Sequence, residues 1–62
     1  MPEFVEKLIH DIERYLRKTG MSQTAFGTKV MGDPNFVARL KEGKNPQART
    51  VDKVRKFLDD NR

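Results

Sequence analysis

Hydrophobic residues recur with helical spacing through the first third of the chain. In residues 1–19 they occupy one arc of a helical wheel, and every charged residue and His10 lie outside it. The arc consists of Phe4, Val5, Leu8, Ile9, Ile12, Tyr15 and Leu16. This pattern predicts a helix from Met1 to Thr19, opened by Pro2 and closed by Gly20. The apolar stripe is typical of a core-facing surface, and a partner-binding face is the alternative.

A second, shorter helix is predicted from Gln23 to Met31. Ser22 is a favourable N-cap, because its hydroxyl oxygen can accept a hydrogen bond from an amide of the first turn. Gly32 can adopt the left-handed conformation that ends a helix. A third helix then restarts, with Asp33 as its cap and Pro34 at its first position, where a missing N–H costs nothing. Asp33 as a cap is favoured over Asp33 as a base reader.

Gly27 is unusual because it lies inside the second helix. Glycine there costs roughly 1 kcal/mol relative to alanine, so a close helix crossing is expected to require it. Steeply crossed helices joined by a tight turn are the arrangement of a helix-turn-helix. We therefore expect alanine to be tolerated at Gly27 and valine not. The side chains spaced to face this crossing are Phe26, Val30, Val37 and Leu40.

The last helix follows a loop. Gly43 is expected to stop the third helix, and the loop runs on to Pro46. Thr50 is expected to cap a fourth helix from Val51 to about Asp60, whose inward stripe is Val51, Val54, Phe57 and Leu58. Since no strand pattern or internal repeat is present, we predict an all-α fold. Residues 1–62 are expected to form a single compact four-helix domain that contains a helix-turn-helix.

Composition limits the functions that fit this fold. The chain has 62 residues, no cysteine, one histidine and a net charge of +4. It contains no nucleophile motif, no phosphate-binding glycine loop and no carboxylate pair in an evident cleft, so we expect neither an enzyme, a metal site nor a cofactor. With no long apolar run and no secretory signal, no membrane association is expected, and we expect the protein in the cytoplasm.

Positive charge is concentrated in the middle of the chain. Residues 23–49 carry five basic and two acidic residues, whereas residues 1–22 carry four of each. A phosphate-binding surface requires such a concentration, although ordinary solubilising charge is the alternative. Lys41, Lys44 and Arg49 form the cluster that favours phosphate contacts.

The third helix has a polar outer face. The helical period leaves Asn35, Ala38, Arg39 and Glu42 on the side away from the core. Arg39 is the best candidate for a base contact, since a guanidinium can bind guanine O6 and N7 together. Asn35 can read adenine or bind a phosphate, and Phe36 is expected to be half-buried rather than to contact a thymine methyl group.

The stretch from Met21 to Leu58 resembles the lambda-repressor-like (Cro/CI-type) helix-turn-helix DNA-binding family. The resemblance covers about two-thirds of the chain. Its turn glycine comes one residue later than is usual in that family. The residues that carry it are Phe26, Gly27, Gly32, Asp33, Pro34, Asn35, Phe36, Val37, Leu40, Gly43 and Pro46.

The resemblance implies a set of DNA-binding residues. At the start of the second helix, Gln23 and its N-terminal neighbourhood are expected to contact the DNA backbone. Thr24 and Thr28, which the helical period places on the outer side of this helix, are also expected to bind DNA. Base edges in the groove are expected to be read by Asn35, Ala38 and Arg39, with Pro34 at the groove mouth. After the third helix, phosphates are expected to be bound by Lys44, Asn45 and Arg49, beside Lys41.

The function expected from the sequence is specific binding of double-stranded DNA. The protein would act as a transcriptional regulator, repressor-like and of phage or bacterial type. Two copies, or a weak homodimer, would bind a palindromic site. The alternative is a small protein-interaction module, such as an antitoxin-like adaptor, that uses the first or fourth helix. Single-strand binding would need exposed aromatic rings, for which Tyr15 is the sole candidate.

Overall fold

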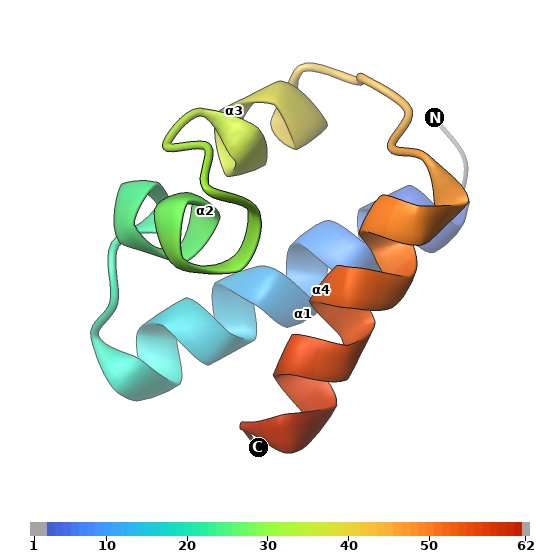
Figure 1. Cartoon of the computed structure of the whole chain (residues 1–62). Coiled ribbons are helices and arrows are strands. Elements are labelled where there is room, and N and C mark those ends of the chain that lie inside the picture. The colour runs from blue at the N-terminus through green and yellow to red at the C-terminus, as the bar shows by residue number, and fades with distance from the viewer. Residues whose placement is uncertain (1–2, 62) are drawn as a thin grey trace.

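Four helices form the structure, which is a computed structural model that describes the backbone of residues 3–61 and the side chains of residues 5–61. The helices are α1 (Glu3–Thr19), α2 (Gln23–Met31), α3 (Phe36–Lys41) and α4 (Ala48–Asp60). The predicted all-α, four-helix fold is confirmed. In Figure 1 the long helices α1 and α4 cross in the lower half of the molecule, and α2 and the short α3 lie above and to the left of them. The expected opening of α1 by Met1 and Pro2 lies outside the described residues.

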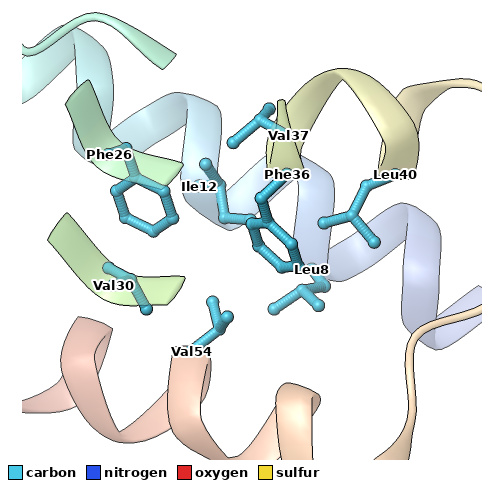
Figure 2. Packing of buried hydrophobic residues seen from close by; sticks show 8 residues of the cluster. All are labelled: Leu8, Ile12, Phe26, Val30, Phe36, Val37, Leu40 and Val54. Carbon is cyan, nitrogen blue, oxygen red and sulfur yellow. The ribbon is translucent and has the colours of Figure 1, made fainter. Parts of the chain in front are cut away.

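The core lies where the four helices converge. Figure 2 shows its buried cluster, which consists of Leu8, Ile12, Phe26, Val30, Phe36, Val37, Leu40 and Val54. Every helix contributes at least one of these side chains, and α3 contributes three although it is the shortest. No polar side chain is buried among residues 5–61. Apolar burial is therefore the main source of stability, as a chain of this length without disulfides requires.

The predicted apolar stripes face this core. In α1, Val5, Leu8 and Ile12 are fully buried, while the side chain of Phe4 lies outside the described residues. In α4 only Val54 is buried, and its other stripe residues are half-buried against the cluster. The α1 stripe therefore packs into the core, with Ile9, Tyr15 and Leu16 half-buried against it.

Both ends of α2 were predicted correctly. The Ser22 hydroxyl oxygen accepts a hydrogen bond from the Ala25 amide at 3.1 Å. Gly32 has a φ of 66°, and its amide donates to the Thr28 carbonyl at 2.9 Å. A left-handed residue at this position satisfies carbonyls that the helix end would leave unpaired.

The start of α3 differs from the sequence prediction. The Asp33 carbonyl accepts the Phe36 amide at 3.2 Å, so residues 33–36 form a β-turn with Pro34 at its second position. The α-helix begins only at Phe36. Asp33 does cap, because its carboxylate accepts the Asn35 amide at 3.0 Å, but it caps this turn and not the helix proper.

The start of α4 also differs. The helix begins at Ala48, two residues before the expected cap Thr50, which lies inside the first turn. Gln47 occupies the N-cap position with an extended backbone and no side-chain cap bond, and its carbonyl accepts the Val51 amide at 3.0 Å. Burial of Val54 fixes α4 in place. Gln47 can therefore occupy the N-cap position although its side chain makes no cap bond.

Gly27 lies at the contact between α2 and the turn that precedes α3. A Cβ atom on Gly27 would overlap the Asp33 carbonyl oxygen and would lie 3.3 Å from Phe36 Cβ. In addition, the Gly27 carbonyl accepts the Asp33 amide at 3.2 Å. The two backbones therefore touch without a side chain between them. The expectation that alanine is tolerated at Gly27 is wrong, because even a methyl group meets main-chain atoms that cannot rotate away.

We expect Gly27→Ala to destabilise the domain by roughly 1–3 kcal/mol, since the overlap outweighs the gain of about 1 kcal/mol in helix propensity. Urea unfolding followed by circular dichroism measures the difference. Thr28→Ala is the matched control in the same helix, because Thr28 is exposed and its loss should leave stability within about 0.5 kcal/mol. An alanine variant as stable as the wild type would show that α2 does not pack this closely.

One ion pair joins α1 to α4. Arg55 Nη1 lies 2.5 Å from Asp11 Oδ2, and both side chains are partly buried. The hydrogen bond from Arg55 lowers the pKa of Asp11 below its usual value, against a smaller opposing effect of desolvation. Because the folded pKa is the lower one, the contribution is complete above the unfolded pKa of about 3.9 and is lost as the pH falls through the folded value.

Asp11→Asn should therefore lower the free energy of unfolding at neutral pH by about 0.2–1 kcal/mol, the usual range for a partly exposed pair. The difference from the wild type should begin to shrink as the pH falls below about 4 and should vanish only below the lowered pKa of the folded state. Thermal melts at a series of pH values test this. A difference that persists unchanged at the acid end would mean that the asparagine acts through packing and not through charge.

Candidate nucleic-acid interface

The candidate site is built on α2, α3 and the turn of residues 32–35 between them. The buried residues Phe36, Val37 and Leu40 fix the rotation of α3 about its axis. That rotation leaves Asn35, Glu42 and the half-buried Ala38 directed away from the core. The outer face of α3 is therefore as predicted, although it is only about two turns long.

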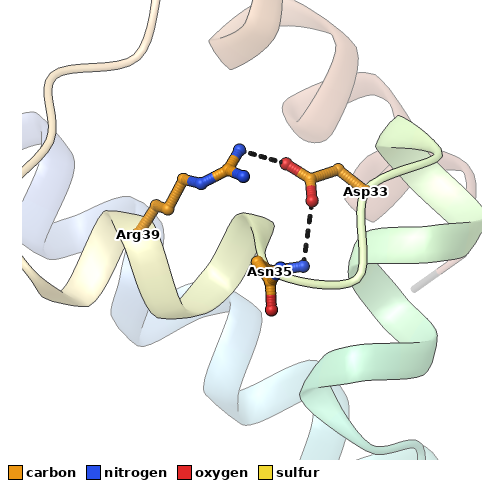
Figure 3. A network of polar contacts seen from close by, with 3 residues as sticks. All are labelled: Asp33, Asn35 and Arg39. Atoms are coloured by element: carbon orange, nitrogen blue, oxygen red, sulfur yellow. Dashed lines mark hydrogen bonds and ion pairs between the residues drawn. The ribbon is translucent and has the colours of Figure 1, made fainter.

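Arg39 lies at one edge of this face and is held by the turn. Its Nη1 donates to Asp33 Oδ2 at 2.5 Å, while Asp33 Oδ1 accepts the amide of Asn35 (Figure 3). The Arg39 side chain remains 56% exposed. One carboxylate thus joins the turn to α3 and orients the guanidinium through a single Nη1 hydrogen bond.

Next to Arg39 is a shallow hollow of about 280 Å³ between α3 and the loop that follows it. Lys44 and Asn45 contribute to its rim together with Arg39. Its floor is mainly apolar and includes Phe36 and Leu40. The structure therefore brings three of the predicted DNA-binding residues to the same edge of α3.

At the opposite edge of α3, Lys41 connects three helices. Its Nζ donates to Gln23 Oε1 at 3.1 Å and lies 3.1 Å from Glu13 Oε2. Because the ammonium takes the amide oxygen, the amide NH₂ group of Gln23 is left as the free end of that side chain. Gln23 and Lys41, both predicted site residues, are thus in direct contact.

Except for Asn35, whose amide donates to Asp33, the remaining predicted residues stand apart from these two groups. Pro34 and Asn35 are exposed in the turn, and Thr24 and Thr28 are exposed on α2. Arg49 is exposed in the first turn of α4. Within residues 3–61, no hydrogen bond or ion pair between side chains links Thr24, Thr28 or Arg49 to another predicted site residue.

Sequence reasoning missed the carboxylates of this surface. Asp33 was expected only to cap, yet it also pairs with Arg39, and Glu13 of α1 was not expected near Lys41. Asp33 and Arg39 are only six residues apart, so their ion pair could have been inferred from the sequence. The second pair depends on how α1 packs against α3, which no local pattern reports. As a result, the α3 surface carries less unpaired positive charge than the sequence suggested.

Other kinds of site are not evident in the described part of the chain. Among residues 3–61, no three histidine, cysteine or acidic side chains are grouped so as to hold a metal ion. The same residues include no helix long and apolar enough to cross a membrane. Tyr15, the candidate for base stacking, packs edge-on against Phe26 and Phe57 with ring centroids 5.8 and 5.5 Å away.

Comparison with known proteins adds no assignment. Neither protein-family models, nor curated proteins, nor solved structures give a significant match to this chain.

The Asp33 carboxylate should be replaceable by an amide but not by a methyl group. Asp33→Asn keeps an oxygen that can accept the Asn35 amide, so most of the stability should remain. Asp33→Ala should cost about 0.5–2 kcal/mol, the usual effect of losing a cap. Paired urea titrations of the two variants measure this. Equal losses in both would show that the Arg39 ion pair, and not the turn, is the larger contribution.

Proposed function

We propose that this protein binds double-stranded DNA, with α3 in the major groove and the edges of the α2–α3 pair on the flanking phosphates. The observation that carries the proposal is the outer face of α3, which is free of other elements and has donors on both edges. Gln23 and Lys41 lie at one edge, and Arg39 and Lys44 at the other. Donors that flank an exposed helix in this way suit a groove with phosphates on either side.

The N-terminus of α2 also supports the proposed contact with DNA phosphates. The Ser22 side chain satisfies only the Ala25 amide, and the first amides of a helix have no partner inside it. Together with the free NH₂ group of Gln23, these amides can donate to a phosphate oxygen. Such contacts position the protein without reading the sequence.

Specific recognition is assigned to the outer face of α3 and to Arg39. Asp33 engages one Nη1 hydrogen bond of Arg39, so the opposite edge of the guanidinium can still bind guanine O6 and N7. Asn35 and Ala38 would contact neighbouring base pairs. The cytoplasmic, repressor-like transcriptional regulator suggested by the family resemblance is the role that fits such a module.

Because α3 is short, one copy can read only a few base pairs. Specific sites would then hold two copies, as a weak homodimer or as two monomers on a palindrome. Their half-sites would lie one DNA turn, or about 34 Å, apart.

The first test is the dependence of binding on salt. If Lys41, Lys44 and Arg49 each neutralise a phosphate, the slope of log K against log salt should be about −3 per bound copy. Fluorescence anisotropy with a labelled random-sequence duplex gives this slope. A dependence close to zero would exclude the phosphate contacts and with them the proposal.

The second test separates base reading from charge. Arg39→Ala should reduce the binding free energy by about 1–3 kcal/mol on a site selected from random duplexes. The loss should be confined to one base pair, where the variant should no longer prefer one base over the others. Lys44→Ala should weaken the binding of all DNA sequences by a similar factor. It should also reduce the slope of log K against log salt by about one unit. Both side chains are exposed, so circular dichroism should show folded variants. Full base preference in the Arg39 variant would remove that residue from the reading face.

A further inference from the structure

A second surface lies at the end of the molecule away from α3. In Figure 1, α1 and α4 diverge below their crossing, and α3 lies at the opposite, upper end. Between the diverging halves is an open groove of about 850 Å³, larger than the hollow beside Arg39. None of the residues expected to bind DNA lines it.

The ion pair that joins the two helices is part of the groove lining. Asp11 comes from α1 and Arg55 from α4, and their contact at 2.5 Å neutralises both charges. One acidic group of the lining, Asp11, is therefore already matched. The other is Asp59, which lies on the α4 side and has a partner of its own.

The α1 wall is positively charged. Arg14, Arg17 and Lys18 line it and are all exposed. Within residues 3–61 none of the three takes part in an ion pair. By contrast, Arg39 and Lys41 on the α3 surface both have a carboxylate partner. The groove wall therefore carries three basic side chains that have no carboxylate partner among residues 3–61.

The floor of the groove is partly apolar and fixed in place. Tyr15 and Leu58 contribute to it, and both are half-buried. Tyr15 is held edge-on by Phe26 and Phe57, whose rings are themselves 5.5 Å apart. A rigid aromatic edge of this kind offers contact area at a small cost in conformational entropy.

We infer that this groove docks an acidic amphipathic helix of a partner protein. A helix laid between α1 and α4 would pack at ordinary helix–helix distances of about 8–10 Å. Its apolar face would lie on Tyr15 and Leu58, and its carboxylates would lie beside Arg14, Arg17 and Lys18. Electrostatic complementarity of this kind steers association and selects the partner.

An acidic helix fits the groove better than nucleic acid does. An amphipathic helix can cover the apolar side chains of Tyr15 and Leu58, whereas a phosphate backbone has no apolar face to place on them. The groove also lies between two packed helices, so a duplex could touch only its rim. Since the groove and α3 are at opposite ends, the inference does not depend on DNA binding, and both ligands can be held together.

The test is an NMR titration of the ¹⁵N-labelled full chain with a synthetic peptide about four turns long. The peptide carries leucines on one face and glutamates on the other, and the control peptide has lysine in place of every glutamate. Amide shifts should be confined to the second half of α1 and to α4, and the lysine peptide should cause none.

Matched variants then assign the binding to charge on the groove wall. Arg14→Gln combined with Lys18→Gln should weaken binding of the acidic peptide about tenfold, because two of the three basic side chains on the groove wall are lost. Lys53→Gln combined with Lys56→Gln removes the same charge from exposed positions of α4 outside the groove lining, and should leave the affinity unchanged. Circular dichroism verifies that both variants fold.

Several results would overturn the inference. They are the absence of binding, equal binding of the two peptides, and shifts confined to α2 and α3. A titration with duplex DNA can also overturn the inference. If DNA shifts the amides of the groove, this surface is a nucleic-acid contact instead. DNA shifts on α3 with none from the acidic peptide would support the proposed function while defeating this inference.

Discussion

The close approach of two backbones at Gly27 is the constraint on which the rest of the structure depends. The turn before α3 rests directly on α2, with the Asp33 carbonyl in the space that any Cβ would fill. This contact fixes the position of α3 against α2 and lets one short helix bury three apolar side chains. If the turn were displaced, Phe36 would leave the cluster, and Asp33 would no longer be placed to hold Arg39. Packing and surface chemistry thus share one main-chain contact.

Local rules predicted those parts of the fold that local interactions decide. Ser22 and Gly32 end α2 where their side-chain chemistry and backbone freedom indicated. The starts of α3 and α4 were misjudged for a common reason, since Pro34 and Thr50 are favourable near a helix start but do not compel one there. Proline fits the second position of a β-turn equally well, and tertiary burial placed the beginning of α4 at Ala48 without a capping side chain.

The electrostatic part of the site was harder to predict from sequence. Counting charges between Gln23 and Arg49 indicated a basic surface, but it could not show that Glu13 from α1 would reach Lys41. The converse holds for α1, which lies in a stretch, residues 1–22, with four basic and four acidic residues. Only the divergence of α1 and α4 turns three of these basic residues into one wall of a groove. The partners of a charged side chain are therefore set by tertiary packing and cannot be read from a count of charges along the sequence.

Tyr15 gives this protein a built-in reporter. The chain has one tyrosine and no tryptophan, so the fluorescence of the protein, apart from the weak emission of phenylalanine, comes from a single ring. That ring touches Phe26 of α2 and Phe57 of α4 while it borders the open groove. Its emission therefore responds both to loss of the three-helix junction and to any molecule that covers the groove. The unlabelled wild-type chain is its own optical probe, and no engineered dye or added tryptophan is needed to follow it.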